Sequence, residues 1–213
     1  SFSDIGDGSA SIQLYVRKDD LGDEVYDTWQ TLDIGDYVGV EGGLMRTRSG
    51  ELTLRIDSYA LLAKSLRSLP EKWHGLKDTE IRYRKRYLDL AVNDGVREIF
   101  RCRAKTLRTL RAHMDAHGFI EVETPIMQPQ YGGALARPFT THHNTLDIDL
   151  YLRIAPELYL KRLLVGGLER VYELNRNFRN EGVSTQHNPE FTMLEFYAAY
   201  WDYQGMMEFV EEL

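Results

Sequence analysis

The sequence predicts an α+β chain in which a small antiparallel β-barrel precedes a domain that combines helices with an antiparallel sheet. Two observations predict this class. Between residues 1 and 64, apolar and polar residues alternate with the two-residue period of strands. Beyond residue 95, a helical pattern is followed by two long alternating segments that predict a hairpin. The 213 residues, 43% of them hydrophobic, can bury a core in one large domain or two smaller ones.

The predicted barrel rests on three alternating runs in the first 64 residues. Their apolar positions are Ile12, Leu14 and Val16, then Val38 and Val40, then Leu52, Leu54 and Ile56. Glycine-containing pairs such as Gly35-Asp36 and Ser49-Gly50 separate the runs and indicate turns. This spacing is typical of a small antiparallel barrel. The run Ser1-Phe2-Ser3 begins as though inside a strand, so we expect the barrel to be incomplete at this end.

The second domain is expected over residues 95–213, after a polar, irregular linker at 65–94. Apolar residues from Val96 to Met114 mark one face of a helix, and Gly118 stands where a C-terminal cap belongs. An alternating strand starting at Ile120 ends at Pro125, because proline has no amide hydrogen for a ladder. Further on, Pro156 predicts the first turn of a helix that runs to Gly166-Gly167.

The predicted hairpin comprises residues 170–179 and 190–200, and its side chains divide into two faces because residues two apart point the same way. One face is mostly apolar and includes Tyr172, Leu174, Leu194 and Phe196. The other face holds Glu173, Asn175, Asn177, Arg179, Phe191, Met193, Glu195 and Tyr197. Such a mixture is unusual for a solvent-exposed face. It indicates a binding site for a ligand that has an anion, an aromatic ring and a cation.

The net charge of −7 is distributed unevenly. Ten Lys and Arg but only three Asp and Glu lie between Arg82 and Arg111; a solvated helix face and contact with an RNA backbone both explain this run. The single cysteine, Cys102, excludes an internal disulfide, and we expect it to be a small buried side chain. With no apolar run of about 18 residues and no signal-peptide pattern in the first seven residues, we expect a cytoplasmic protein that does not bind membranes.

Several longer motifs resemble the class II aminoacyl-tRNA synthetases. The segments Phe178-Arg179-Asn180-Glu181 and His187-Asn188-Pro189-Glu190-Phe191-Thr192 resemble motif 2 of that family, and Phe100 to Pro125 resembles the helix and strand of motif 1. The segments that resemble the lysine-specific members are Arg82 to Leu90, Arg137-Pro138-Phe139, Thr141 to Asn144 and Arg153 to Lys161. The resemblance covers nearly the whole chain. It implies a partial OB-fold barrel at 1–64, followed by the first half of a class II antiparallel-sheet catalytic domain.

For the nucleotide, the resemblance implies a site around motif 2. Arg179 would hold the α-phosphate of ATP, where its planar guanidinium can follow the charge that develops during the reaction. Glu181, His187 and Asn188 would contact the nucleotide, and Phe191 would stack beneath adenine. Arg179, Glu181 and His187 are therefore the candidate catalytic residues.

For the amino acid, the resemblance implies recognition of L-lysine. Glu157 would bind the α-ammonium, and Gly133 would lie against the substrate because it lacks a side chain. Glu195 and Tyr197 would bind the ε-ammonium, and a site with buried acceptors rejects neutral side chains. The implied reaction is formation of lysyl-adenylate and pyrophosphate from lysine and ATP. Transfer of the lysyl group to the 3′ end of tRNA(Lys) would follow.

For macromolecular partners, the resemblance implies tRNA(Lys) and a second copy of the chain. Bases of the anticodon would stack on aromatic side chains of the barrel and bond to nearby polar groups. Phe2 and Gln13 match anticodon-contacting positions, and Glu51 is a third candidate. Motif 1 forms the homodimer interface in this family, so Pro125 is expected at that interface.

No metal ligand is expected within these residues. The family's magnesium ligands lie downstream, and no segment here resembles motif 3, so we expect Mg²⁺ to be bound by residues outside this chain and the chain alone to be nearly inactive. His113 and His117 have the spacing of zinc ligands. However, no third ligand is evident in the sequence, and the C-terminal end of a helix favours histidine for electrostatic reasons.

Other interpretations remain open from the sequence alone. Without the resemblance, Arg179 and Glu181 would form a surface ion pair, and Phe191 and Tyr197 would be core aromatics; Glu195 favours a ligand site. A lysine-adenylating paralogue that modifies a protein is disfavoured by the barrel-like segment. A non-catalytic dimerising or tRNA-binding relic is a third possibility. An aspartate or asparagine enzyme would not need Glu195 and Tyr197 to bind a cation.

Overall fold

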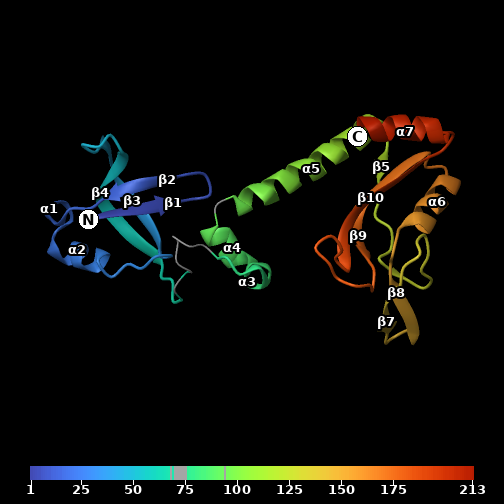
Figure 1. Cartoon of the computed structure of the whole chain (residues 1–213), viewed down its shortest axis with the longest axis horizontal. Helices are drawn as coiled ribbons and strands as arrows, with labels where there is room; N and C mark the ends of the chain where they lie inside the picture. Colours follow the sequence, from blue (N-terminus) through green and yellow to red (C-terminus); the bar gives the residue numbers. More distant parts are fainter. Residues whose placement is uncertain (68, 70–75, 94) are drawn as a thin grey trace. The chain divides into compact units, whose positions relative to one another are not determined.

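The computed structural model describes residues 1–67, 69, 76–93 and 95–213. They form two compact units, Ser1–Ile99 and Phe100–Leu213, whose elements are labelled in Figure 1. Each unit has a hydrophobic core of its own. Within these described residues, no helix is both long and apolar enough to cross a membrane.

The sheet of the first unit has four strands in the order β1-β2-β4-β3. The strands are β1 (Phe2–Gly6), β2 (Ser11–Tyr15), β3 (Tyr37–Arg46) and β4 (Leu52–Ala63). All three predicted alternating runs are confirmed as strands. The prediction of purely antiparallel pairing is wrong for one pair, because β2 and β4 run parallel. Parallel neighbours need a crossover connection, and here α1, α2 and β3 separate them along the chain.

The segment between β2 and β3 corrects a second expectation. The sequence predicted strands and turns throughout residues 1–64, but this segment forms α1 (Lys18–Leu21) and α2 (Asp23–Trp29). Gly22, at a φ of 81°, joins the two helices. The helices position Trp29 in the core, where its ring meets Tyr59 edge-on at 4.9 Å between centroids. The local sequence pattern favours helix only weakly here, and burial of the Trp29 side chain against the sheet stabilises the two helices instead.

Within the predicted irregular linker at 65–94, residues 79–92 form helices, and residues 68, 70–75 and 94 lie outside the described residues. The helices are α3 (Thr79–Arg84) and α4 (Arg86–Val92). Asp89 is fully buried and accepts hydrogen bonds from Arg82 (2.8 Å), Arg86 and Asn93 (2.6 Å). Burial acts to raise the pKa of Asp89, but these donors outweigh it and lower the pKa. Two arginines of the basic run therefore have partners within the protein.

The long helix α5 (Val96–Ala116), most of which belongs to the second unit, confirms the predicted helix. The helix ends at Ala116, and the predicted cap residue Gly118 follows it with a φ of 74°, which lets the Phe119 amide donate to the carbonyl of Met114. Met114 is fully buried, but Ile99 is 67% exposed. The expectation of a buried Cys102 is wrong, because this side chain is exposed on the same N-terminal half of the helix.

Two three-stranded sheets follow α5. The first has the order β10-β9-β5 and contains β5 (Ile120–Glu121), β9 (Arg170–Phe178) and β10 (Glu190–Ala198). The second has the order β6-β8-β7 and contains β6 (Met127–Gln128), β7 (Phe139–His143) and β8 (Ile148–Leu152). The predicted hairpin is confirmed as the antiparallel pair β9/β10. The strand predicted to reach Pro125 is shorter and ends at Glu121.

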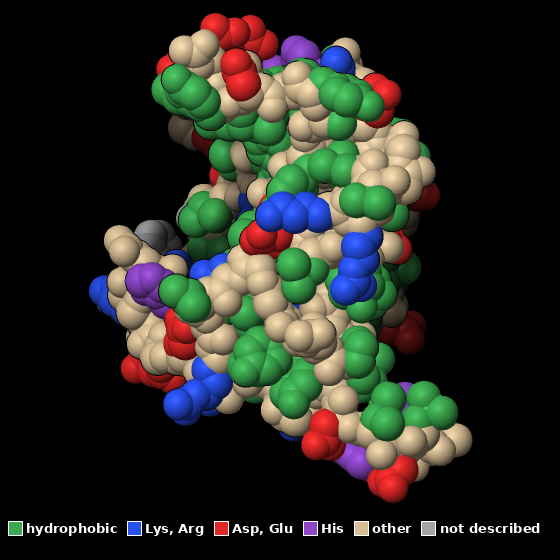
Figure 2. All heavy atoms as spheres, turned by 90° about the vertical axis from the view of Figure 1, so that its right-hand side faces the viewer, with side chains coloured by type: hydrophobic (Ala, Val, Ile, Leu, Met, Phe, Trp, Pro, Cys, Tyr) green, Lys and Arg blue, Asp and Glu red, His purple; other side chains and the backbone are tan. Residues whose placement is uncertain are grey.

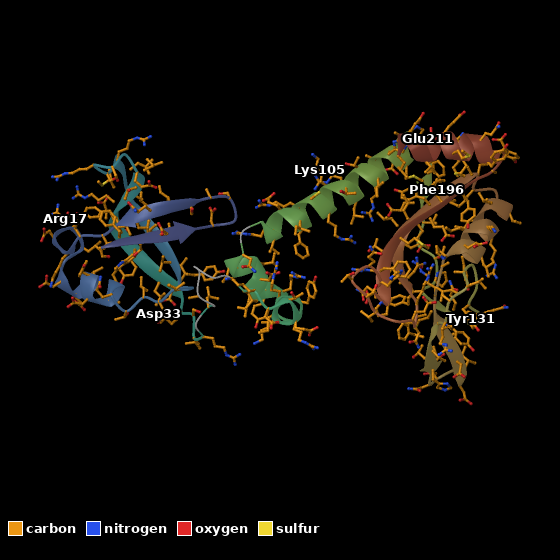
Figure 3. All side chains as sticks on the ribbon, viewed as in Figure 1. Arg17, Asp33, Lys105, Tyr131, Phe196 and Glu211 are labelled. Atoms are coloured by element: carbon orange, nitrogen blue, oxygen red, sulfur yellow. The ribbon has the colours of Figure 1, made fainter. Side chains whose placement is uncertain are left out.

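Two further helices complete this unit. They are α6 (Glu157–Val165), for which Pro156 is the N-cap rather than a first-turn residue, and α7 (Tyr203–Glu212). The core contains Met114, Phe119, Tyr172 and Phe209, with side chains from one face of the hairpin packed against them. One of these is Phe196 of β10, labelled in Figure 3, whose ring lies 5.4 Å from that of Phe209. The predicted apolar face is confirmed, so the opposite face of β9/β10 is left to its polar residues.

Candidate active site

The register of the hairpin brings the predicted polar side chains together in pairs. Glu195 lies opposite Glu173, Met193 opposite Asn175, and Phe191 opposite Asn177. Directly opposed residues in an antiparallel pair share a face. Both strands therefore present the residues that the two-residue period assigned to the ligand face.

At one end of this face, Glu195 and Tyr197 form a hydrogen-bonded pair. The Tyr197 hydroxyl donates to Oε1 of Glu195 over 2.8 Å. Burial raises the pKa of Glu195 and is also the main cause that raises the pKa of Tyr197. The carboxylates of Glu157 and Glu173 raise the pKa of Glu195 further. A half-buried carboxylate among other carboxylates is electrostatically suited to a cationic ligand.

Glu173, which lies opposite Glu195, forms a buried ion pair with Arg153. The sequence did not predict the role of this ion pair. Arg153 is fully buried and donates from Nη1 to Oε1 of Glu173 over 2.6 Å. Thr124 donates its hydroxyl to the other oxygen of Glu173 over 2.6 Å. A charged residue between the apolar Leu152 and Ile154 was the available signal. Arg153 fixes Glu173 and opposes the rise in the pKa of Glu195.

Helix α6 brings Glu157 to the same end of the face. Gly133, at a φ of 86°, approaches it so closely that a Cβ built there would stand 2.7 Å from Cβ of Glu157. Lys161, one turn along α6, donates to Oε1 of Glu157 over 2.6 Å, and its Nζ is 5.7 Å from the centre of the Tyr197 ring. The four residues predicted for lysine binding thus lie on three neighbouring segments, and an ammonium group of the protein already contacts one of them.

At the other end of the face, Arg179 and Phe191 are stacked. The guanidinium carbon of Arg179 is 5.1 Å from the centre of the Phe191 ring, a cation–π geometry. Two buried polar atoms nearby, Nε of Arg179 and Oδ1 of Asn177, have no hydrogen-bond partner among the described residues. Buried polar atoms are usually paired in native proteins, so these two are suited to a ligand that supplies an acceptor and a donor.

The loop between β9 and β10 contains the remaining predicted nucleotide contacts. Glu181, His187 and Asn188 are all exposed. His187 is held within the loop, because its Nδ1 is 2.9 Å from the hydroxyl of Ser184. The structure brings Arg179 and Phe191 into contact with each other, but among the described residues the side chains of these three loop residues form no hydrogen bond or ion pair with either of them.

The carboxylates described at this site do not fit a magnesium ion. Those of Glu195, Glu173 and Glu157 each accept a hydrogen bond from Tyr197, Arg153 or Lys161, respectively. Magnesium requires several oxygen ligands in near-octahedral geometry. Across the described residues, the group of three or more potential metal ligands that does form lies elsewhere, at His113, His117 and Glu212.

In the first unit, the candidate anticodon residues share one face of the sheet. Phe2 pairs with Tyr15, and their ring centroids are 4.8 Å apart; Phe2 is 58% exposed. Gln13 lies two residues before Tyr15 on the same face and accepts a hydrogen bond from Thr53 over 3.0 Å. Glu51 is exposed and immediately precedes β4, two residues before Thr53. Exposed aromatics with adjacent polar groups are the usual surface for stacking unpaired bases.

Pro125 is exposed and follows the short strand β5, and its carbonyl accepts a hydrogen bond from the side chain of Gln128 over 3.0 Å. The prediction that this proline ends the strand is wrong, because β5 already ends at Glu121. Exposed apolar side chains occur on the preceding helix α5, at Ile99 and Phe100.

Comparison with known proteins gives the same family as the motifs. A model of the class II tRNA synthetases (D, K and N) matches residues 78–213. The chain belongs to this family. A model described as an OB-fold nucleic acid binding domain matches residues 1–62 of this synthetase. The expected fold class is confirmed: an OB-fold region precedes a class II synthetase region.

Curated relatives are similar to this synthetase over its whole length. Lysine–tRNA ligases of Pelotomaculum thermopropionicum and Carboxydothermus hydrogenoformans are each 62% identical to it over 213 residues. A lysine–tRNA ligase of Clostridium tetani is 57% identical over 212 residues. The aligned region is 42%, 44% and 42% of these three relatives, respectively, so the chain spans less than half their length.

Proposed function

We propose that this chain is part of a lysine–tRNA ligase. The enzyme would activate L-lysine with ATP to lysyl-adenylate and transfer the lysyl group to the 3′ end of tRNA(Lys). The observation that best supports lysine is the hydrogen-bonded pair of Glu195 and Tyr197, whose carboxylate is half-buried and lies near two further carboxylates. The names of the relatives, which are 57–62% identical, support the same assignment.

Lysine would bind between β10 and α6. Its ε-ammonium would bond to Glu195 and Tyr197, and its α-ammonium to Glu157. Lys161 now donates to Glu157, so the substrate must compete with it or Lys161 must turn away when lysine binds. Neutral amino acids of the same length would leave Glu195 without a cation, and the site therefore discriminates against them.

ATP would bind at the other end of the hairpin face. Arg179 would donate to the α-phosphate, and Phe191 would support adenine. The lysine carboxylate would then attack the α-phosphorus, forming the acyl phosphate bond while pyrophosphate leaves. The lone Nε of Arg179 and Oδ1 of Asn177 are available for the nucleotide. No side chain forms a covalent intermediate in this mechanism, so the contribution of the site is positioning and charge stabilisation.

The anticodon of tRNA(Lys) would bind to the face formed by Phe2, Tyr15 and Gln13, with Glu51 at its edge. This proposal is supported by the exposed aromatic pair and by the match of residues 1–62 to a nucleic acid binding domain. We also propose a homodimer that covers the exposed apolar residues of α5, with Pro125 at the interface. We further propose a cytoplasmic location, because translation uses aminoacylated tRNA there.

Lysine-dependent exchange of pyrophosphate into ATP tests the proposed activity. The assay should compare the protein encoded by the complete reading frame with the 213 residues alone. We expect exchange with lysine and none with norleucine, which has the same length but no ε-ammonium. We expect almost no exchange from the 213 residues alone, because the resemblance places motif 3 and the Mg²⁺ ligands outside these residues. Equal exchange with norleucine, or none with lysine in the complete protein, would contradict the proposal.

A further inference from the structure

The C-terminal end of α5 presents two histidines to one side. His113 and His117 are four residues apart, and their ring centroids are 4.3 Å apart. Nδ1 of His117 is 2.8 Å from the carbonyl oxygen of His113, and a carbonyl can only accept, so this nitrogen carries the hydrogen. Nε2 of His117 is then left with its lone pair. A backbone bond that fixes the ring in this way is common behind metal-binding histidines.

His113 supplies a second nitrogen that lacks a partner. Its Nε2 is buried, and among the described residues it has no hydrogen-bond partner. A buried imidazole nitrogen usually bonds to the protein or to water. The unpaired Nε2 of His113 is therefore suited to bind a metal ion through its lone pair.

A third potential ligand comes from α7. Oε2 of Glu212 is 3.6 Å from Nε2 of His117, and the candidate ligand atoms of His113, His117 and Glu212 all lie within 4.8 Å of one another. In a tetrahedral zinc site with bonds of about 2.0–2.2 Å, ligand atoms are roughly 3.3 Å apart. Small side-chain rotations would close this difference. The sequence analysis found no third ligand because Glu212 is 95 residues beyond His117.

The position of α7 is fixed by packing rather than by these ligands. Phe209 is buried, and its ring centroid lies 5.2 Å from those of both histidines. Asp202 caps the start of the helix by accepting from the amide of Gly205 over 2.9 Å. Glu212 is therefore held one turn beyond a core residue, above the two imidazoles. The preorganised backbone lowers the entropic cost of gathering three ligands.

The surroundings are open and acidic. A surface depression of about 450 Å³ is lined by His117, Asp202, Glu208 and Glu212, among other residues. Figure 2 shows Asp and Glu side chains gathered with a His at the top of this unit, the height at which Figure 1 draws α7. Carboxylates around the depression favour entry of a cation, and the space leaves room for a water molecule as a fourth ligand.

We propose that His113, His117 and Glu212 form a Zn²⁺ site that links α7 to the C-terminal end of α5. Two imidazoles and one carboxylate are a ligand set typical of zinc and unlike the all-oxygen sets of magnesium and calcium. The site lies on the core side of the β9/β10 hairpin, because Phe209 packs against Phe196, whereas Glu195 points to the other face. The site is separate from the proposed lysine and ATP sites, which lie on the opposite face of the hairpin.

The test uses the complete protein, freed of metal with a chelator and titrated with ZnCl₂ in competition with a chromophoric chelator. We expect one Zn²⁺ per chain and a higher unfolding temperature with zinc than without, because the metal binds the folded state. We expect Glu212→Gln and His113→Gln to weaken zinc binding by more than about tenfold, the loss that even an outer-shell partner brings. Glu212 has a side chain 64% exposed, so this variant should fold normally.

Glu208→Gln is the matched control. It removes the same charge from the same helix, one turn earlier, and it lines the same depression without belonging to the ligand set. We expect it to keep the affinity and the thermal shift within about twofold. The proposal is overturned if zinc does not bind or raise the unfolding temperature, or if Glu208→Gln weakens binding as much as Glu212→Gln. Either result would leave the two histidines as part of the aromatic core around Phe209.

Discussion

The two ends of the polar face of β9/β10 differ in how far their polar atoms are already paired. At the amino-acid end, the carboxylates of Glu195, Glu173 and Glu157 all have protein donors, and the buried polar atom without a described partner is Nη2 of Arg153. At the nucleotide end, Arg179 keeps a buried Nε without a described partner, and the loop residues remain exposed. Where the polar groups are already held by the protein, a ligand binds only if its own groups match them. Where polar atoms lack partners, the ligand supplies those partners. If the proposed function is correct, lysine would replace the Lys161 contact at a largely paired site, whereas ATP would supply partners at an open one.

The largest loss of activity should come from replacing Arg179, whose buried Nε has no described hydrogen-bond partner at the nucleotide end. Replacing it with Gln (Arg179→Gln) removes a charge aimed at the reacting phosphate, so the exchange rate should fall by about 10³-fold. Arg176→Gln is the control, since Arg176 is an exposed arginine on the opposite face of the same strand. Rates of ATP–pyrophosphate exchange at saturating lysine measure both. Similar losses in the two variants would argue against a nucleotide site on this face.

Glu195→Gln tests the amino-acid end. Removing one partner of a half-buried charge pair costs about 3 kcal/mol, which is roughly 100-fold in the KM for lysine. The KM for ATP should change little, because the other end of the face has different partners. Glu190→Gln, at an exposed position that begins β10, controls for loss of charge on the strand. If KM for ATP rises as much as KM for lysine, the two ends do not act separately.

Gly133→Ala asks whether close packing sets the position of Glu157. The added Cβ would stand 2.7 Å from Cβ of Glu157, and the φ of 86° is strained for any residue with a side chain. We expect about a tenfold rise in the KM for lysine and a loss of ~1–2 kcal/mol in the free energy of unfolding. Gly167→Ala separates the two causes, because Gly167 has a φ of 95° but nothing within 4 Å of the added Cβ. It should lose stability without a change in the KM for lysine.

The smallest effect concerns the pH dependence of stability. Burial raises the pKa of Glu195 above the ordinary value of 4.5, so the folded state retains a proton that the unfolded chain releases. This contribution stabilises the fold below pH 4.5 and is lost as pH rises through the raised pKa. Glu195→Gln stays uncharged, so it should raise the unfolding temperature of the ligand-free protein at pH 8 more than at pH 4. Thermal unfolding across this range measures the difference, and a variant that is less stable at pH 8 would contradict the expectation.

Much of the active-site face could be predicted because strand parity is local. A two-residue period assigns Glu195 and Tyr197 to one face and Phe196 to the other whatever the strands pack against, and the register agrees. The helix ending at Gly118 was equally accessible, since a glycine with positive φ there closes the last turn. The predicted roles of these residues in binding lysine and ATP stay predictions.

Other parts depended on which face of each segment became buried. The pattern of residues 18–29 was too weak to predict helices, and Trp29 stabilises them only by entering a core made by distant strands. Cys102 was expected to be buried from its residue type, but no described element covers it on α5. Burial is a property of the packed chain, so a residue's type alone does not determine it.

The sequence by itself determined the local geometry: alternating strands, the capped helix α5, and the division of the hairpin into two faces. Only the tertiary structure decided which distant side chains meet. It brought Arg153 beneath Glu173, Gly133 against Glu157, and Glu212 above His113 and His117. The physical reason is range. Backbone preferences act over a few residues, whereas these contacts join segments 20 or more residues apart, and the packing of the core selects them.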